Sequence, residues 1–153
     1  MPESFRTRCM RWGFNLWPCY RGTGGQVTFI AADWREVRVL VPLSWRTRNY
    51  VGSIFGGSLY GAIDPFFMIM LMKILGPDVV VWDKAAVIRF RKPGRSALRA
   101  SFRLDEAELA EIHRLLQAQP KVDRTYSVQL VDAKGVVHAD VEKVIHIALR
   151  NPS

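Results

Sequence analysis

The chain has 153 residues, of which 49% are hydrophobic and 24% charged, so it fits one globular domain with a hydrophobic core and excludes a largely disordered chain. The net charge is +8, and 16 of the 22 basic residues are arginine. Arginine suits phosphate-bearing partners, namely nucleic acid, an anionic membrane or a phosphorylated small molecule, although a solvated surface is also often basic.

Two further features concern location. Cys9 and Cys19 form no CxxC pair and are too few for a disulfide framework, so a reducing cytoplasmic setting is expected. The apolar run 65–72 is far shorter than the roughly 20 residues that span a bilayer. We therefore expect no transmembrane segment.

The first 20 residues show helical periodicity. Phe5, Cys9, Trp12 and Leu16 recur on one face, arginines occupy the others, and Pro18 stops the pattern. The pattern predicts an N-terminal helix over 1–20. Packing of this stripe on the domain is the ordinary outcome, and contact with a membrane surface is the alternative. The following "RGTGG" (21–25) predicts a turn.

Strand patterns follow. "VTFIAA" from Val27 and "VRVLVPL" from Val37 predict two short strands, and the segment 56–75 is apolar nearly all round, as in a helix buried inside a protein. Period-two alternation then predicts strands over 85–92 and 97–104. Asp105 with Glu108 starts a helix over 105–119, and two closing strands flank a hairpin turn at 132–135.

Together these elements predict an α+β fold in one domain, 1–153. Its mostly antiparallel sheet of about five or six strands would curl around the apolar helix. This arrangement would bury both the helix and the apolar face of the sheet.

Asp64 is the single acid in the apolar stretch between Tyr50 and Met72. It could cap a helix that begins at Pro65, which local signals favour slightly. Alternatively the helix begins near Gly57 and contains Pro65, at a cost of about 3 kcal/mol in an ordinary helix. Gly61, four residues before the proline, would ease a local kink.

The stretch "FGGSLYGAID" (55–64) resembles the motif of hotdog-fold thioesterases of the phenylacetate-pathway type, in which a His-Gly-Gly triplet precedes a catalytic Asp by the same interval. Gly56, Gly57 and Asp64 match, Asn49 matches an asparagine common in that group, and Phe55 stands where the family has His. The later strands are also similar, so the likeness spans 49–147. It implies a hotdog fold, to which the N-terminal helix and the helix 105–119 are additions.

The resemblance implies a mechanism. The Gly57 N–H would donate to the thioester oxygen, and Asp64 would act as general base or nucleophile. Seven helical residues separate the two by roughly 10 Å, so two antiparallel helices across a dimer axis would bring Asp64 of one chain to Gly57 of the other. Substrate-binding candidates are Asn49, Phe55 and Gly56, with four basic residues for the phosphates of coenzyme A: Arg89, Arg91, Lys92 and Arg95. A solvated strand edge is the simpler explanation for these four.

We therefore expect an acyl-CoA or acyl-carrier thioesterase that assembles as a dimer or a dimer of dimers and uses no cofactor beyond the coenzyme A of its substrate. The alternative is a non-catalytic acyl-thioester-binding module, which Phe55 in place of His favours. No metal site is expected, because His138, Asp140, Glu142 and His146 are spaced along one strand face. No nucleic-acid partner is expected either. Phe90 and Phe102 lie on the opposite strand face from the neighbouring arginines, so the basic face carries no aromatic side chains on which bases could stack.

Overall fold

The computed structural model describes residues 1–150, which contain five helices and six strands. The helices are α1 (Phe5–Leu16), α2 (Pro18–Thr23), α3 (Gly56–Ile63), α4 (Phe66–Leu75) and α5 (Glu106–Ala118). The strands are β1 (Gln26–Ile30), β2 (Glu36–Val41), β3 (Val79–Phe90), β4 (Leu98–Arg103), β5 (Lys121–Val131) and β6 (Val137–Leu149). The α+β content is as predicted, although β3 begins earlier than the expected strand.

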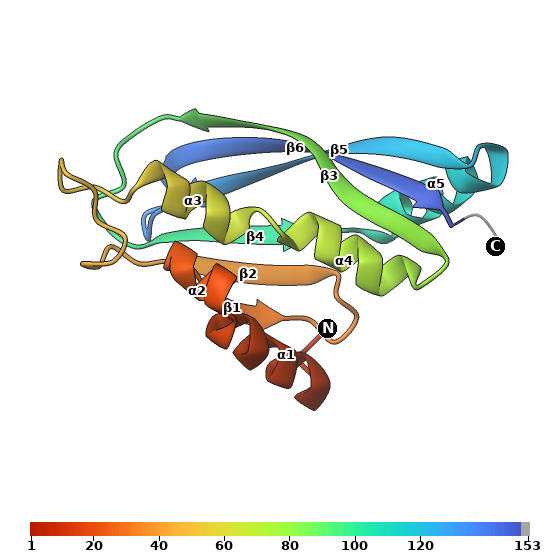
Figure 1. The fold of residues 1–153 in the computed structure, drawn as a ribbon, viewed down its shortest axis with the longest axis horizontal. Helices are drawn as coiled ribbons and strands as arrows, with labels where there is room; N and C mark the ends of the chain where they lie inside the picture. Colours follow the sequence, from red (N-terminus) through yellow and green to blue (C-terminus); the bar gives the residue numbers. More distant parts are fainter. Residues whose placement is uncertain (151–153) are drawn as a thin grey trace.

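All six strands form one antiparallel sheet in the order β1-β2-β4-β5-β6-β3. The sheet curves, so that α3 and α4 lie end to end between its β1-β2-β4 part and its β5-β6-β3 part (Figure 1). The short strand β1 and the long strand β3 form its two edges. This wrapped arrangement is the fold predicted from the sequence.

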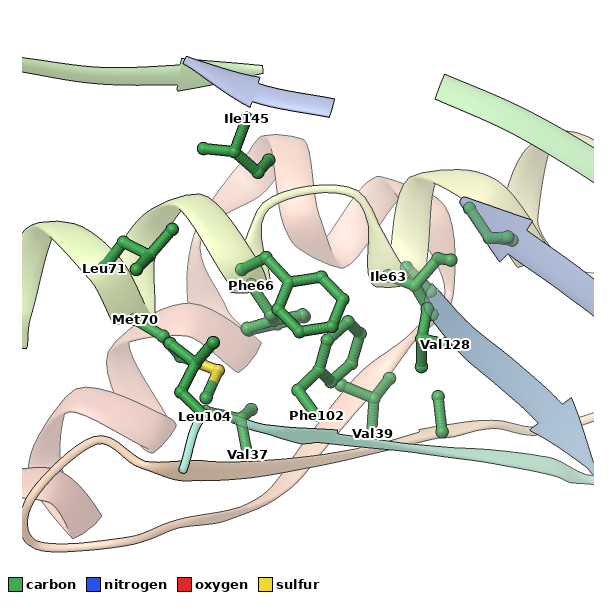
Figure 2. Close-up of a cluster of buried hydrophobic side chains, with 14 of the residues drawn as sticks. Val37, Val39, Ile63, Phe66, Met70, Leu71, Phe102, Leu104, Val128 and Ile145 are labelled. Atoms are coloured by element: carbon green, nitrogen blue, oxygen red, sulfur yellow. The ribbon is translucent and has the colours of Figure 1, made fainter. Parts of the chain in front are cut away.

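The hydrophobic core lies between the two central helices and the concave face of the sheet. Ile63, Phe66, Met70 and Leu71 of the helices are fully buried, and in Figure 2 they face side chains from β2, from the β4 region, from β5 and from β6. The Phe66 and Phe102 ring centroids lie 5.3 Å apart. Full burial of each such side chain contributes about 1.5–3 kcal/mol, so the core fixes the central helices firmly against the sheet.

The central helix is interrupted at Asp64 and Pro65, which keep helical backbone angles between α3 and α4. Pro65 has no N–H, which explains why the hydrogen-bond ladder breaks here. The helix begins at Gly56, ahead of the acid, and no side chain caps the start of α4. The predicted capping role of Asp64 is therefore wrong, and its carboxylate has other partners.

The N-terminal segment differs from the prediction in two ways. It contains two helices, because Trp17 has an extended backbone and Pro18 begins α2. Residues 21–23, which were expected in a turn, belong to α2. This helix ends at Gly24, whose φ is 79°. The apolar stripe also faces outward: Phe5, Cys9, Trp12 and Leu16 are all exposed. The expectation that this stripe packs on the domain is wrong.

Polar contacts and one aromatic side chain fix α1 instead. The Asn15 amide donates to the Val27 carbonyl oxygen at 2.9 Å and accepts from the Val27 N–H at 2.7 Å, so it satisfies one backbone pair on the outer edge of β1. The Phe14 ring packs edge-on against Phe66 at 6.2 Å between centroids. Glu3 pairs with Arg11 at 2.8 Å. These contacts hold α1 beside β1 (Figure 1).

Helix α5 follows its sequence pattern closely. The Asp105 carboxylate accepts from the Glu108 N–H at 2.8 Å, and Leu109, Ile112 and Leu116 form the buried stripe. Glu108 in turn pairs with Arg124 of β5 at 2.6 Å. The predicted closing hairpin is also present, with Gly135 in a positive-φ turn.

The 20 residues Gly56–Leu75, with a mean hydropathy of 1.5, are long and apolar enough to cross a membrane. In this fold they form α3 and α4, whose inner faces pack on the sheet. A buried core helix therefore accounts for their composition.

Candidate active site

Asp64 lies beside a lysine that is completely buried. The Lys143 ammonium, on β6, is 2.7 Å from the Asp64 carboxylate and also donates to the Asp64 backbone carbonyl. The Asp64 side chain remains 41% exposed, whereas that of Lys143 is 0% exposed. Asp64 is therefore held in one orientation while part of its carboxylate stays open to water or a ligand.

A second carboxylate completes the cluster. Asp83 of β3 lies 2.9 Å from the Lys143 ammonium, as an ion pair without the alignment of a hydrogen bond. Burial raises the pKa of Asp83, and Lys143 opposes that shift. Burial and the nearby Asp64 carboxylate likewise raise the pKa of Tyr60, whose ring centroid is 5.7 Å from the ammonium. Three separate elements thus position one buried cation against the candidate acid.

The start of α3 carries the glycine pair. No side chain caps this helix, so its first N–H groups keep their donors for other partners. A Cβ at Gly57 would lie only 2.4 Å from the Phe55 ring, and a Cβ at Gly56 would lie 2.9 Å from the Phe90 ring. A side chain at either position would require the neighbouring, half-exposed aromatic ring to move.

Four predicted substrate-binding residues line one cavity of about 360 Å³: Asn49, Gly56, Arg91 and Lys92. The Asn49 amide oxygen accepts from the Ser53 N–H at 3.0 Å, so this side chain also closes the turn before α3. Arg91 pairs with Asp140 at 2.6 Å. The cavity therefore joins the N-terminus of α3 to a basic rim.

The remaining predicted residues lie elsewhere. Phe55, Gly57, Asp64, Arg89 and Arg95 do not line this cavity. Within one chain, Gly57 and Asp64 lie at opposite ends of α3, about 10 Å apart along its axis. One protomer alone does not bring the candidate donor and the candidate acid together.

Asp64 instead lines a larger, mostly apolar cleft of about 730 Å³ between α1–α2 and the central helix. Its wall includes Phe14, Tyr20 and Ile69, and Gly13 leaves open space there, because a Cβ at this position would meet no atom within 4 Å. A cleft of this size and character falls within the range of small-molecule sites.

Sequence reasoning missed Lys143 and Asp83. The signal was present, because Lys143 interrupts the inward-facing apolar residues of the last strand, Val141 and Ile145. A lysine on an apolar strand face needs a buried partner, and Asp64 was the acid available in the apolar helix.

A match to a known sequence family covers most of the chain. The sequence matches the family described as "Domain of unknown function (DUF4442)" over residues 6–147. The chain belongs to the DUF4442 family. No curated protein matches the sequence.

Solved structures resemble this DUF4442 protein over nearly its whole length. A probable thioesterase of unknown function from Pseudomonas aeruginosa is 20% identical, with a TM-score of 0.82, and the match covers 98% of this chain and 99% of that chain. A thioesterase from Haemophilus influenzae is 10% identical, with a TM-score of 0.70 and coverage of 98% and 95%. The PaaI protein of the phenylacetic acid degradation operon of E. coli is 16% identical, with a TM-score of 0.64 and coverage of 92% and 91%. The DUF4442 chain therefore has the hotdog fold of thioesterases.

Proposed function

We propose that this protein hydrolyses acyl thioesters of coenzyme A at a site shared by two protomers. The observation that carries the proposal is the Asp64 carboxylate, partly exposed and fixed by the buried Lys143, at the break in the central helix. The thioesterases that share the fold support the reaction class.

Hydrolysis of the thioester needs one general base and one hydrogen-bond donor to the carbonyl oxygen. A water molecule attacks the thioester carbonyl carbon, and Asp64 accepts the proton of that water. The C–S bond then breaks, and the departing thiolate takes this proton from Asp64 and leaves as the thiol, which restores the carboxylate. The Gly57 N–H of the second protomer donates to the carbonyl oxygen as negative charge develops on it, aided by the positive end of α3. The products are a carboxylic acid and coenzyme A.

The second protomer is inferred from the free edge of the sheet. Strand β3 is 12 residues long, and Trp82, Val87 and Phe90 on it are about half exposed. A long edge strand with exposed apolar side chains is a template for pairing with another chain. Pairing of two β3 strands would bring the two central helices side by side.

The two hollows then have separate roles. The cavity lined by Asn49, Arg91 and Lys92 takes the phosphate-bearing part of coenzyme A, because it is basic and reaches the start of α3. The apolar cleft beside Asp64 takes the acyl group.

The first experiment measures turnover of a panel of acyl-CoA esters by wild type and Asp64→Asn. The variant is expected to lose at least about a hundredfold in kcat, because a general base contributes about 10²–10⁴-fold. Asp33→Asn is the control for an unrelated carboxylate. Unchanged turnover in Asp64→Asn would end the hydrolase proposal, and tight acyl-CoA binding without turnover in wild type would favour the non-catalytic acyl-thioester module.

Mixing two inactive variants tests the shared site. Asp64→Asn is mixed, unfolded and refolded together with Gly57→Pro, which removes the proposed N–H donor in the first turn of α3, where proline is tolerated. A mixed dimer contains one intact site only if Asp64 and Gly57 come from different chains. Activity of the mixture above that of either variant is expected. No recovery, with mixed dimers present by mass, would place the site within one chain.

Gly13 tests the acyl cleft. Gly13→Leu fills open space in the cleft and is expected to reduce turnover of long acyl chains more than that of short ones. Gly22→Leu is the matched control, because a Cβ at Gly22 also meets no atom within 4 Å and this residue lies outside the cleft. An equal effect of both variants on all chain lengths would contradict the assignment.

A further inference from the structure

The outward stripe of α1 is a large apolar surface with no partner among the described residues. Three of its side chains are strongly exposed, Phe5 at 81%, Trp12 at 58% and Leu16 at 64%, and Trp17, which directly follows α1, is 64% exposed. Together with Cys9 they form the α1 stripe. A surface helix ordinarily turns its apolar face toward the core, and a contiguous exposed patch marks an interaction site.

The stripe cannot reach the core by rotation of α1. The opposite side of the helix is anchored by the two Asn15 hydrogen bonds to Val27 and by the packing of Phe14 between Trp34 and Phe66. The Ser4 and Thr7 side chains form a reciprocal cap at its start. The Asn15 and Phe14 contacts would be lost if the helix turned, so the fold itself presents the stripe to the outside.

Basic charge surrounds the stripe. Residues 1–32 contain four arginines and a single acid, Glu3, which is 13% exposed and engaged by Arg11 and Arg8. Arg6 and Arg21 are exposed. Trp12 and Leu16 also share a groove of about 570 Å³ with Arg21 and Arg46, so apolar and cationic groups lie next to one another.

We propose that the α1 stripe and its arginines are a docking surface for a membrane rich in anionic phospholipids. A helix face of Trp, Phe and Leu bordered by arginines is suited to the boundary between headgroups and acyl chains. The arginines fit the lipid phosphates. A second copy of this chain fits poorly, because a two-fold contact would bring uncompensated arginines together. The proposal does not depend on the thioesterase activity.

The experiment measures co-sedimentation of the full chain with vesicles of phosphatidylcholine mixed with phosphatidylglycerol, and with vesicles of phosphatidylcholine alone. Binding is expected to the anionic vesicles only, and it is expected to weaken as NaCl is raised, because the electrostatic part is screened. Binding to neither vesicle, or equal binding to both at every salt concentration, would overturn the proposal.

Two pairs of variants separate the apolar and the cationic parts. Trp12→Ser/Leu16→Ser is expected to lower the vesicle partition coefficient at least about tenfold through lost apolar burial. Arg6→Gln/Arg21→Gln is expected to lower it about fivefold for each arginine removed. The matched controls are Tyr50→Ser/Val51→Ser, which removes exposed apolar side chains elsewhere, and Arg99→Gln/Arg103→Gln on β4.

Both α1 variants are expected to keep the wild-type Tm, since the replaced side chains are exposed. Vesicle binding that survives in both, or that falls equally in the controls, would overturn the proposal. Light scattering after gel filtration is the last measurement. If the protein binds no vesicle and its oligomer dissociates in Trp12→Ser/Leu16→Ser, the stripe is an interface between copies of this chain and the proposal is overturned.

Discussion

Helices α1 and α5 have similar lengths and similar sequence signals, yet they use their apolar faces in opposite ways. In α5 the stripe of Leu109, Ile112 and Leu116 is buried, whereas in α1 the corresponding stripe faces outward. The difference arises from polar anchors: Asn15 fixes the polar side of α1 to the edge of β1, while Glu108 of α5 binds Arg124 above a buried apolar face. Periodicity therefore locates a helix, but its partners decide which side is covered.

The largest expected effect tests the contrast directly. Ile112→Ala on α5 should lower the free energy of unfolding by about 2–5 kcal/mol, because the side chain is fully buried. Leu16→Ala on α1 should change it by no more than about 0.5 kcal/mol. Urea unfolding measures both. A similar loss for both variants would mean that Leu16 is covered in solution.

The anchor of α1 gives the next largest effect. Asn15→Leu keeps the size of the side chain but leaves the Val27 N–H and carbonyl without this partner, at a cost of about 1–3 kcal/mol. Gln117→Leu on the exposed side of α5 is the matched amide control and should be nearly neutral. A neutral Asn15→Leu variant would show that α1 is held by its aromatic contacts alone.

The caps should give equal effects on the two helices. Ser4→Ala and Asp105→Ala each remove a side-chain acceptor at a helix start and should each cost about 1 kcal/mol in the same urea measurement. A loss for Asp105→Ala alone would show that α1 contributes little to global stability.

The smallest effect depends on pH. The hydrogen bond and charge of Arg11 hold the pKa of Glu3 below its ordinary value. The Glu3–Arg11 pair therefore stabilises the fold above the unfolded-state pKa of a glutamate, and this contribution is lost as the pH falls through the lower folded-state pKa. The stability difference between wild type and Glu3→Gln should accordingly shrink in acid. A difference that stays constant with pH would contradict the pairing.

Much of the fold could be predicted because its signals are local. The alternation around Phe102, the cap at Asp105 and the turn at Gly135 all appear in the structure. The face of α1 that packs on the domain could not be predicted. It depends on hydrogen bonds between Asn15 and β1, which the periodicity of the α1 sequence does not reveal. A second helix after Pro18 was missed because glycine-rich sequence also fits a turn.

The candidate site could be predicted only in part. The glycine pair and Asp64 stand out by resemblance, and the cavity gathers Asn49, Gly56, Arg91 and Lys92 as a group. The cluster of Lys143 and Asp83 arises from the pairing of β3 with β6, which places residues 60 positions apart in the chain beside one another. Spacing within one segment cannot reveal such a pair.

Lys143 is held by Asp64, by Asp83 and by a backbone carbonyl. The carbonyl belongs to the main chain, so no substitution at position 64 removes it, and Asp83 is supplied by a different strand. Loss of the Asp64 charge thus leaves the ammonium its hydrogen bond to the backbone carbonyl, its ion pair with Asp83 and the helix break intact. The position of the ammonium and the break in the helix therefore do not depend on the Asp64 carboxylate alone.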